Sequence, residues 1–189
     1  VATNLTSIPA AAIGGVLPVG VTGGSGLDAS NIGCSQASLW YLTSSNVGNL
    51  DPSSANLAEL SSMSNVSYSR IGSVMSVSSG IWTFPETGIW RITFHCQSNQ
   101  NAGMSYITAW IKTTTNDGSN WYGVAIASQS AISGAVHAHK SVAETLFDVT
   151  DVTTHKVAFQ FHTHLNGGTL YGEAIPSSTC FIFQRLGDT

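Results

Sequence analysis

Charge is the scarcest property of this 189-residue chain. Asp, Glu, Lys and Arg make up 8% of it, against roughly a quarter in an average soluble protein. The six Lys and Arg residues form no basic run and the net charge is −4, which argues against nucleic acid as a partner. No apolar run reaches about eighteen residues, so the sequence predicts no membrane insertion. The polar surface must come from Ser, Thr, Asn and Gln.

Catalytic motifs are missing as well. The chain has no G-x-S-x-G elbow, no P-loop and no H-E-x-x-H pair. Its acidic residues are scattered singly, apart from Asp148 and Asp151. We therefore expect a protein that is not an enzyme and that needs no cofactor.

Cysteine is sparse and odd in number, with Cys34, Cys96 and Cys180 far apart and no C-x-x-C pair. Cys96 and Cys180 lie inside apolar, strand-like runs, which favours buried free thiols. Free thiols fit assembly in a reducing cytoplasm.

The composition changes near residue 35, which predicts two parts, residues 1–35 and residues 36–189. Gly, Ala, Ser, Thr and Pro dominate the first part, and Pro9 and Pro18 bar a continuous helix. Such a segment cannot bury enough surface to fold alone. It is either a flexible linker or an extended stalk in which three copies share an apolar seam. The seam residues would be Leu5, Ile8, Ile13, Leu17, Val21 and Leu27.

The second part is a succession of strand-like runs. In the segment 79–99, two strands flank a turn at Pro85–Gly88, and period two places Trp90 and Phe94 on one face. Further apolar and β-branched runs follow, separated by turn residues, at 105–115, 121–129, 135–149, 155–165 and 179–187. The pattern predicts an all-β jelly-roll sandwich of about eight to ten antiparallel strands. Only residues 55–63 favour a short helical turn.

Histidine forms two H-x-H pairs, His137/His139 and His162/His164. Residues i and i+2 of a strand share a face, as metal ligation requires. Three copies of the His137/His139 strand around an axis would offer six nitrogens to a transition metal. The alternative is a set of polar residues on a hydrated face or a subunit contact.

Two further candidate sites are small. Asp148 and Asp151 offer carboxylates to Ca²⁺, although Asp in a loop commonly caps backbone groups instead. Trp121 and Tyr122 follow an Asn- and Asp-rich loop, and an exposed aromatic pair of this kind can stack on a sugar of a host-surface glycan. The alternative is a strand that begins with two large residues.

Two resemblances add to this reading. The run NLTSIPAAAIGGVLPVGVTGGSGL at 4–27 resembles the short repeats of bacteriophage fibre proteins. FPETGIWRITF at 84–94 resembles the central signature of the complement globular-head and tumour-necrosis-factor superfamily. CFIFQRLG at 180–187 resembles the last strand of that family, which runs alongside the first. The C-terminal FxFxRLGDT ending also resembles marine phage structural proteins.

The resemblances imply a homotrimeric jelly roll on a virion. We expect a capsid decoration protein or a short fibre knob that attaches to other virion proteins, of the capsid or the tail, stabilises the particle and contacts the host surface. The alternatives are the receptor-binding tip of a tail fibre and a secreted trimeric lectin-like or ligand module.

Overall fold

The structure, a computed structural model, describes residues 34–47, 56–60, 68–100, 105–130, 137–164, 167–173 and 178–189. The chain divides into two units, Val1–Gly33 and Cys34–Thr189. The expected seam residues Leu5, Ile8, Ile13, Leu17, Val21 and Leu27 all lie outside the described residues, so the stalk remains a prediction.

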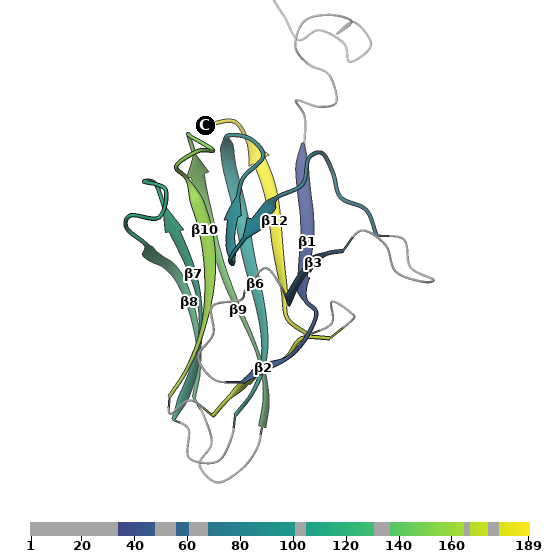
Figure 1. The fold of residues 1–189 in the computed structure, drawn as a ribbon, viewed down its shortest axis with the longest axis vertical. Coiled ribbons are helices and arrows are strands. Elements are labelled where there is room, and N and C mark those ends of the chain that lie inside the picture. The colour runs from purple at the N-terminus through teal and green to yellow at the C-terminus, as the bar shows by residue number, and fades with distance from the viewer. Residues whose placement is uncertain are drawn as a thin grey trace, which may run out of the picture. The chain divides into compact units, whose positions relative to one another are not determined.

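The second unit is a sandwich of two antiparallel sheets (Figure 1). Sheet A runs in the order β2-β11-β6-β12-β1-β3, with β9 on the other edge of β6. Its strands are β1 (Gln36–Leu42), β2 (Asn46–Val47), β3 (Leu57–Glu59), β6 (Gly88–Gln100), β9 (His137–Val149), β11 (Thr169–Leu170) and β12 (Cys180–Gly187). Sheet B runs β4-β5-β10-β7-β8. Its strands are β4 (Ser76–Ser78), β5 (Ile81–Thr83), β7 (Tyr106–Thr114), β8 (Tyr122–Ser130) and β10 (Lys156–Thr163).

An aromatic cluster fills the space between the sheets. The ring of Phe159 on β10 lies 4.6 Å from that of Phe181 on β12 and 5.0 Å from that of Trp82 on β5. Phe94 on β6 stacks on Phe181 at 5.0 Å. All four side chains are at most 1% exposed. Offset and edge-on ring pairs add to the burial energy of large side chains, so this cluster holds sheets A and B together.

The expected strands are present, and their faces alternate as period two requires. Trp90 and Phe94 of β6 point inward with Ile92 and Cys96, and all are at most 1% exposed. The closing strand β12 pairs with the first strand β1, as the family resemblance implied. The expected helical turn at 55–63 is wrong in the described part of that segment, because residues 57–59 pair with β1 as strand β3.

The β7–β8 hairpin of sheet B carries the candidate residues Trp121 and Tyr122 just after its turn. Its turn closes with a hydrogen bond from the Ser119 N–H to the Asn116 carbonyl at 3.2 Å. Asp117 and Gly118 at its centre have φ values of 52° and 84°. Positive φ at both central residues is the type I′ geometry, whose twist matches that of the flanking strands.

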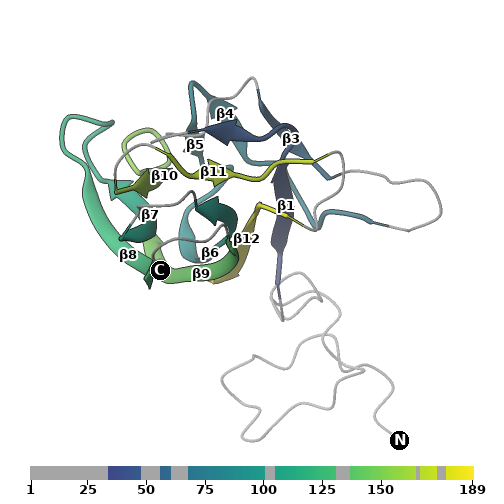
Figure 2. The ribbon, with the colours of Figure 1, turned by 90° about the horizontal axis from the view of Figure 1, so that it is seen from below.

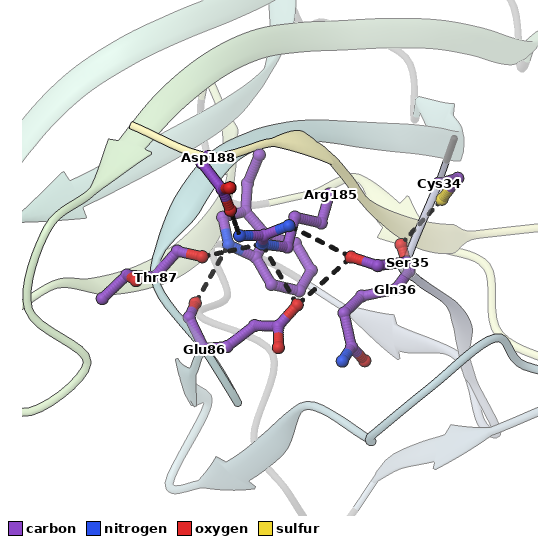
Figure 3. A network of polar contacts seen from close by, with 8 residues as sticks. Cys34, Ser35, Gln36, Glu86, Thr87, Arg185 and Asp188 are labelled. Atoms are coloured by element: carbon purple, nitrogen blue, oxygen red, sulfur yellow. Dashed lines mark hydrogen bonds and ion pairs between the residues drawn. The ribbon is translucent and has the colours of Figure 1, made fainter. Parts of the chain in front are cut away.

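A polar network around Arg185 fastens one end of the sandwich (Figure 3). The Arg185 Nε donates to the Thr87 carbonyl at 2.7 Å and lies 3.1 Å from a carboxylate oxygen of Glu86. Its other nitrogens reach the Ser35 hydroxyl at 3.1 Å and the carboxylate of Asp188. The network joins the PETG turn, the residue before β1 and the RLGDT ending, so the segments 84–94 and 180–187 meet in space.

Candidate functional site

The face of sheet A that points away from sheet B exposes large apolar side chains. Alternation along β9 directs Val142 and Leu146 outward, and Leu186 is exposed at the register shift of β12, on the other side of β6. These side chains are 48%, 62% and 46% exposed. Figure 2 shows β9 along the outer edge of this sheet, next to β8 of sheet B. Apolar side chains gathered on one sheet face are typical of an association surface.

A charged cluster sits in the middle of this face. Arg91 Nη2 donates to a carboxylate oxygen of Glu144 at 2.7 Å, and the Thr93 hydroxyl donates to the same oxygen at 3.1 Å. These hydrogen bonds, Arg91 first, hold the pKa of Glu144 below its ordinary value. Nearby, burial and then the positive charge of Lys140 lower the pKa of His95. The cluster therefore pairs its one carboxylate internally and keeps its imidazole neutral near pH 7.

The cluster lines a hollow of about 310 Å³. Its walls are Arg91, Thr93, His95, Val142, Glu144, Ile182 and Gln184. Glu144, the single carboxylate in the lining, is already bound by Arg91. General acid–base chemistry on a substrate needs a group free to exchange protons with it. Glu144 is held by Arg91 and Thr93, so His95 is the remaining imidazole or carboxyl side chain of this lining.

The metal ring expected at His137 and His139 stays a prediction, and the register of β9 bears on the direction of one of its ligands. His139 pairs with Ser98, which is 1% exposed on the sandwich-facing side of β6. Residues paired across an antiparallel ladder share a face, so His139 points toward sheet B and not toward the exposed face of sheet A. The backbone of His137 continues the same pairing opposite Gln100. Across the described part of the chain, no three His, Cys, Asp or Glu side chains converge as a metal site.

The structure places Asp148 and Asp151 around the end of β9 without a common ligand geometry. One carboxylate oxygen of Asp151 accepts hydrogen bonds from the Thr153 N–H at 2.8 Å and from the Thr153 hydroxyl at 2.6 Å. These bonds lower the pKa of Asp151. Asp148 is exposed on β9. Asp151 thus acts as a loop cap, which was the alternative to a calcium site, and Ca²⁺ binding stays a prediction.

Trp121 and Tyr122 separate in the fold. Tyr122 is 63% exposed at the start of β8, whereas Trp121 is partly buried with its indole beside Gly118 of the hairpin turn. Trp121 also lines a hollow of about 240 Å³ on the outer face of sheet B. Glycan binding by the two as an adjacent pair stays a prediction, and only Trp121 borders a hollow in the described residues.

The cysteines are free thiols, as expected for Cys96 and Cys180. Both are buried, and burial raises the pKa of Cys96 to about 12 and also raises that of Cys180. Cys34 is partly exposed. Two of the three thiols are thus shielded from chemistry in the folded chain.

Sequence reasoning missed the role of Trp110 and Lys112. The sequence placed both residues in the strand-like run 105–115 and gave them no further role. The structure places them on the outer face of sheet B, beside a hollow. Gly123 inside the β8 run was the available signal, because a glycine within a strand often marks a close approach by another group.

Comparison with known proteins supports the fold. No protein-family model matches the chain, and no curated protein matches its sequence. The structure of Eiger TNF from S. frugiperda superimposes with a TM-score of 0.58 at 10% identity, over 81% of this chain and 93% of that one. The crystal structure of murine APRIL at pH 5.0 superimposes with a TM-score of 0.55 at 10% identity, over 80% and 98%. The second unit is therefore a TNF-like jelly roll.

No helix long and apolar enough to span a membrane occurs among the residues that the structure describes.

Proposed function

We propose that the chain is a non-enzymatic structural module that forms a homotrimer through the outer face of sheet A and serves as a virion appendage. The exposed apolar face formed by Val142 and Leu146 of β9 is the observation that carries the proposal. Burying such side chains on association removes apolar surface from water, which is the main driving force for assembly.

A closed ring explains why two different surfaces are apolar. A ring with threefold symmetry uses a heterologous contact, in which one surface of each protomer meets a different surface of the next. The outer face of sheet A supplies one surface. The edge strand β8 supplies a second, because its Val124 is 43% exposed and lines neither hollow of sheet B. Pairing of Arg91 with Glu144 within one protomer leaves little unmatched charge to bury.

The virion role is supported by sequence alone. Residues 4–27 resemble phage fibre repeats, and a low-charge surface suits a coat displayed in salty water. The function is then mechanical: attachment to the capsid or tail, stabilisation of the particle, and adhesion to a host surface. Many identical heads on one particle gain strength from avidity, so each head needs only weak binding.

The solution mass of the purified chain tests the assembly. We expect a mass near three times 19.7 kDa by light scattering. Leu146→Arg, which places a charge on the apolar face, should reduce the mass to that of one chain. Ile81→Arg is the matched control, because Ile81 is 37% exposed on sheet B, and it should leave the trimer intact. A wild-type monomer would overturn the homotrimer.

The virion assignment needs a separate test. Mass spectrometry of density-banded particles of a virus whose genome encodes this chain should detect its peptides in fixed proportion to the capsid protein. Their absence from intact particles would contradict the virion role and leave the trimer result untouched.

A further inference from the structure

The outer face of sheet B carries a hollow of about 550 Å³. It is lined by Tyr106, Thr108, Trp110, Lys112, Gly123, Ile126, Gln160 and His162. These residues come from the three adjacent strands β7, β8 and β10 (Figure 1). The hollow is therefore built by strand register and not by a loop, which gives it a fixed shape.

The indole of Trp110 forms the floor of this hollow. A Cβ on residue 123 would lie 2.7 Å from two ring carbons of Trp110, so the glycine there lets the ring lie flat across β8. The ladder between β7 and β8 shifts register at this point, between Ile111 and Lys112. The indole N–H donates to the Thr108 hydroxyl at 3.2 Å, which fixes the ring in its plane. A flat ring on an open sheet face is a stacking platform.

Polar groups surround the platform at positions that the register sets. Gln160 lies directly opposite Trp110 on β10, and Ile126 lies opposite it on β8. Farther along the same face, Tyr106, four residues before Trp110, and His162, two residues after Gln160, form a stacked pair with ring centroids 6.3 Å apart. An aromatic floor with amide, imidazole and phenol groups at its rim matches a pyranose ring. Such a ring has apolar C–H faces and hydroxyls around its edge.

Lys112 gives this hollow a charge preference. It lies two residues from Trp110 on the same face of β7, a spacing of roughly 7 Å. No carboxylate lines the hollow, and none of the described residues forms an ion pair with Lys112. Lys112 also lines the second hollow on this sheet, the one that contains Trp121. One cation thus stands between two aromatic platforms, in a chain with only six Lys and Arg residues.

We propose that the outer face of sheet B is a binding groove for an acidic glycan. One pyranose ring stacks on Trp110, its carboxylate pairs with Lys112, and the next residue of the glycan extends toward Trp121. The groove lies within one protomer, so the proposal does not depend on the trimer or on the virion role.

Calorimetric titration with defined oligosaccharides tests the groove. The probes are tetragalacturonate and 3′-sialyllactose, which carry ring carboxylates, and maltotetraose, which is neutral. We expect at least one acidic probe to bind with millimolar affinity or better, and maltotetraose to bind at least about tenfold more weakly, the value of one charge-assisted hydrogen bond. Failure of both acidic probes to bind, or equal binding of maltotetraose, would overturn the proposal.

Variants locate the binding. Lys112→Gln should weaken the binding of the acidic probe about tenfold. Lys140→Gln, the same change on the exposed side of β9, should leave the affinity for this probe unchanged. An equal loss of affinity in both variants would show that the probe binds through the overall charge of the protein, and would overturn the proposed groove.

Trp110→Leu keeps apolar volume but removes the stacking ring, and should abolish binding. Gly123→Ala keeps the indole but forces it to move, and should weaken binding together with a change in tryptophan fluorescence. Circular dichroism and thermal unfolding must show each variant folded, and unchanged binding by a folded Trp110→Leu variant would refute the stacking role.

Discussion

The guanidinium of Arg185 lies 3.1 Å from the carboxylate of Glu86, which joins the last strand of the chain to the turn before β6. Arg185 is 13% exposed and Glu86 is 39% exposed. Gly88 makes room for this contact, because a Cβ there would lie 2.6 Å from the Arg185 Nε and 2.5 Å from the Gly187 carbonyl. The glycine of the PETG turn is thus required by its neighbour Arg185 as well as by its φ of 135°.

Removal of Arg185 should destabilise the sandwich. Arg185→Ala leaves the Thr87 carbonyl, the Ser35 hydroxyl and Glu86 without their donor, and we expect a loss of about 2–3 kcal/mol in the free energy of unfolding. Glu86→Gln should cost about 1 kcal/mol or less, because Glu86 is more exposed. Urea unfolding followed by tryptophan fluorescence measures both. Equal effects of the two variants would contradict the central place of Arg185.

The aromatic core should be sensitive to a single truncation. Phe159 touches rings from both sheets and is 1% exposed, so Phe159→Ala should lower the free energy of unfolding by about 3–5 kcal/mol. Tyr122→Ala, at a position 63% exposed, is the control and should have little effect. A small loss in Phe159→Ala would show that sheets A and B are held together elsewhere.

His95 should make stability depend on pH below neutrality. Its pKa in the folded chain is lowered, first by burial and then by Lys140, while Glu144 opposes the shift. Val142 of β9 and Cys180 of β12 pair with it from the adjacent strands. The unfolded chain then binds the proton more readily. The contribution of His95 to the free energy of unfolding is complete above its ordinary pKa of 6.5. It is lost as the pH falls through the lower pKa of His95 in the folded chain.

Thermal unfolding between pH 7.5 and 5.5 measures this effect. The change should be small because His95 is only partly buried, and His95→Gln should reduce the slope. This pH range lies above the pKa of Glu144, which is lowered from its ordinary value of 4.5, so Glu144 stays ionised throughout the measurement. An unchanged slope in His95→Gln would assign the effect to another group.

The three cysteines should differ in reactivity. At pH 8 the native chain should expose about one thiol to Ellman's reagent, that of partly exposed Cys34, because Cys96 and Cys180 are buried with raised pKa values. All three should react in denaturant. Cys34→Ser should remove the fast reaction, and a fast reaction that survives in this variant would show that a buried strand opens readily.

Local pattern determined the strands. Period-two alternation in the segment 79–99 identified a strand and the face that carries Trp90 and Phe94, because burial on one side of a sheet forces alternate residues to be apolar. In β10, Phe159 and Phe161 are buried and His162 lies on the opposite face, as the same alternation requires. Short strands were harder to predict from the sequence. Residues 57–59 were mistaken for part of a helical turn, because a periodic pattern over three residues cannot distinguish a strand from a helix.

Only the tertiary structure decided which side chains meet. The sequence offered His137 and His139 as an axial pair, but the ladder to β6 turns His139 inward, since register depends on the partner strand and a shift of one residue reverses the face. The stacking platform at Trp110 likewise depends on Gly123 from another strand and on a register shift between them. The sequence by itself determined an all-β chain with little charge, because composition and alternation are local properties. The packing of distant strands decided where an exposed apolar face and an aromatic groove arise.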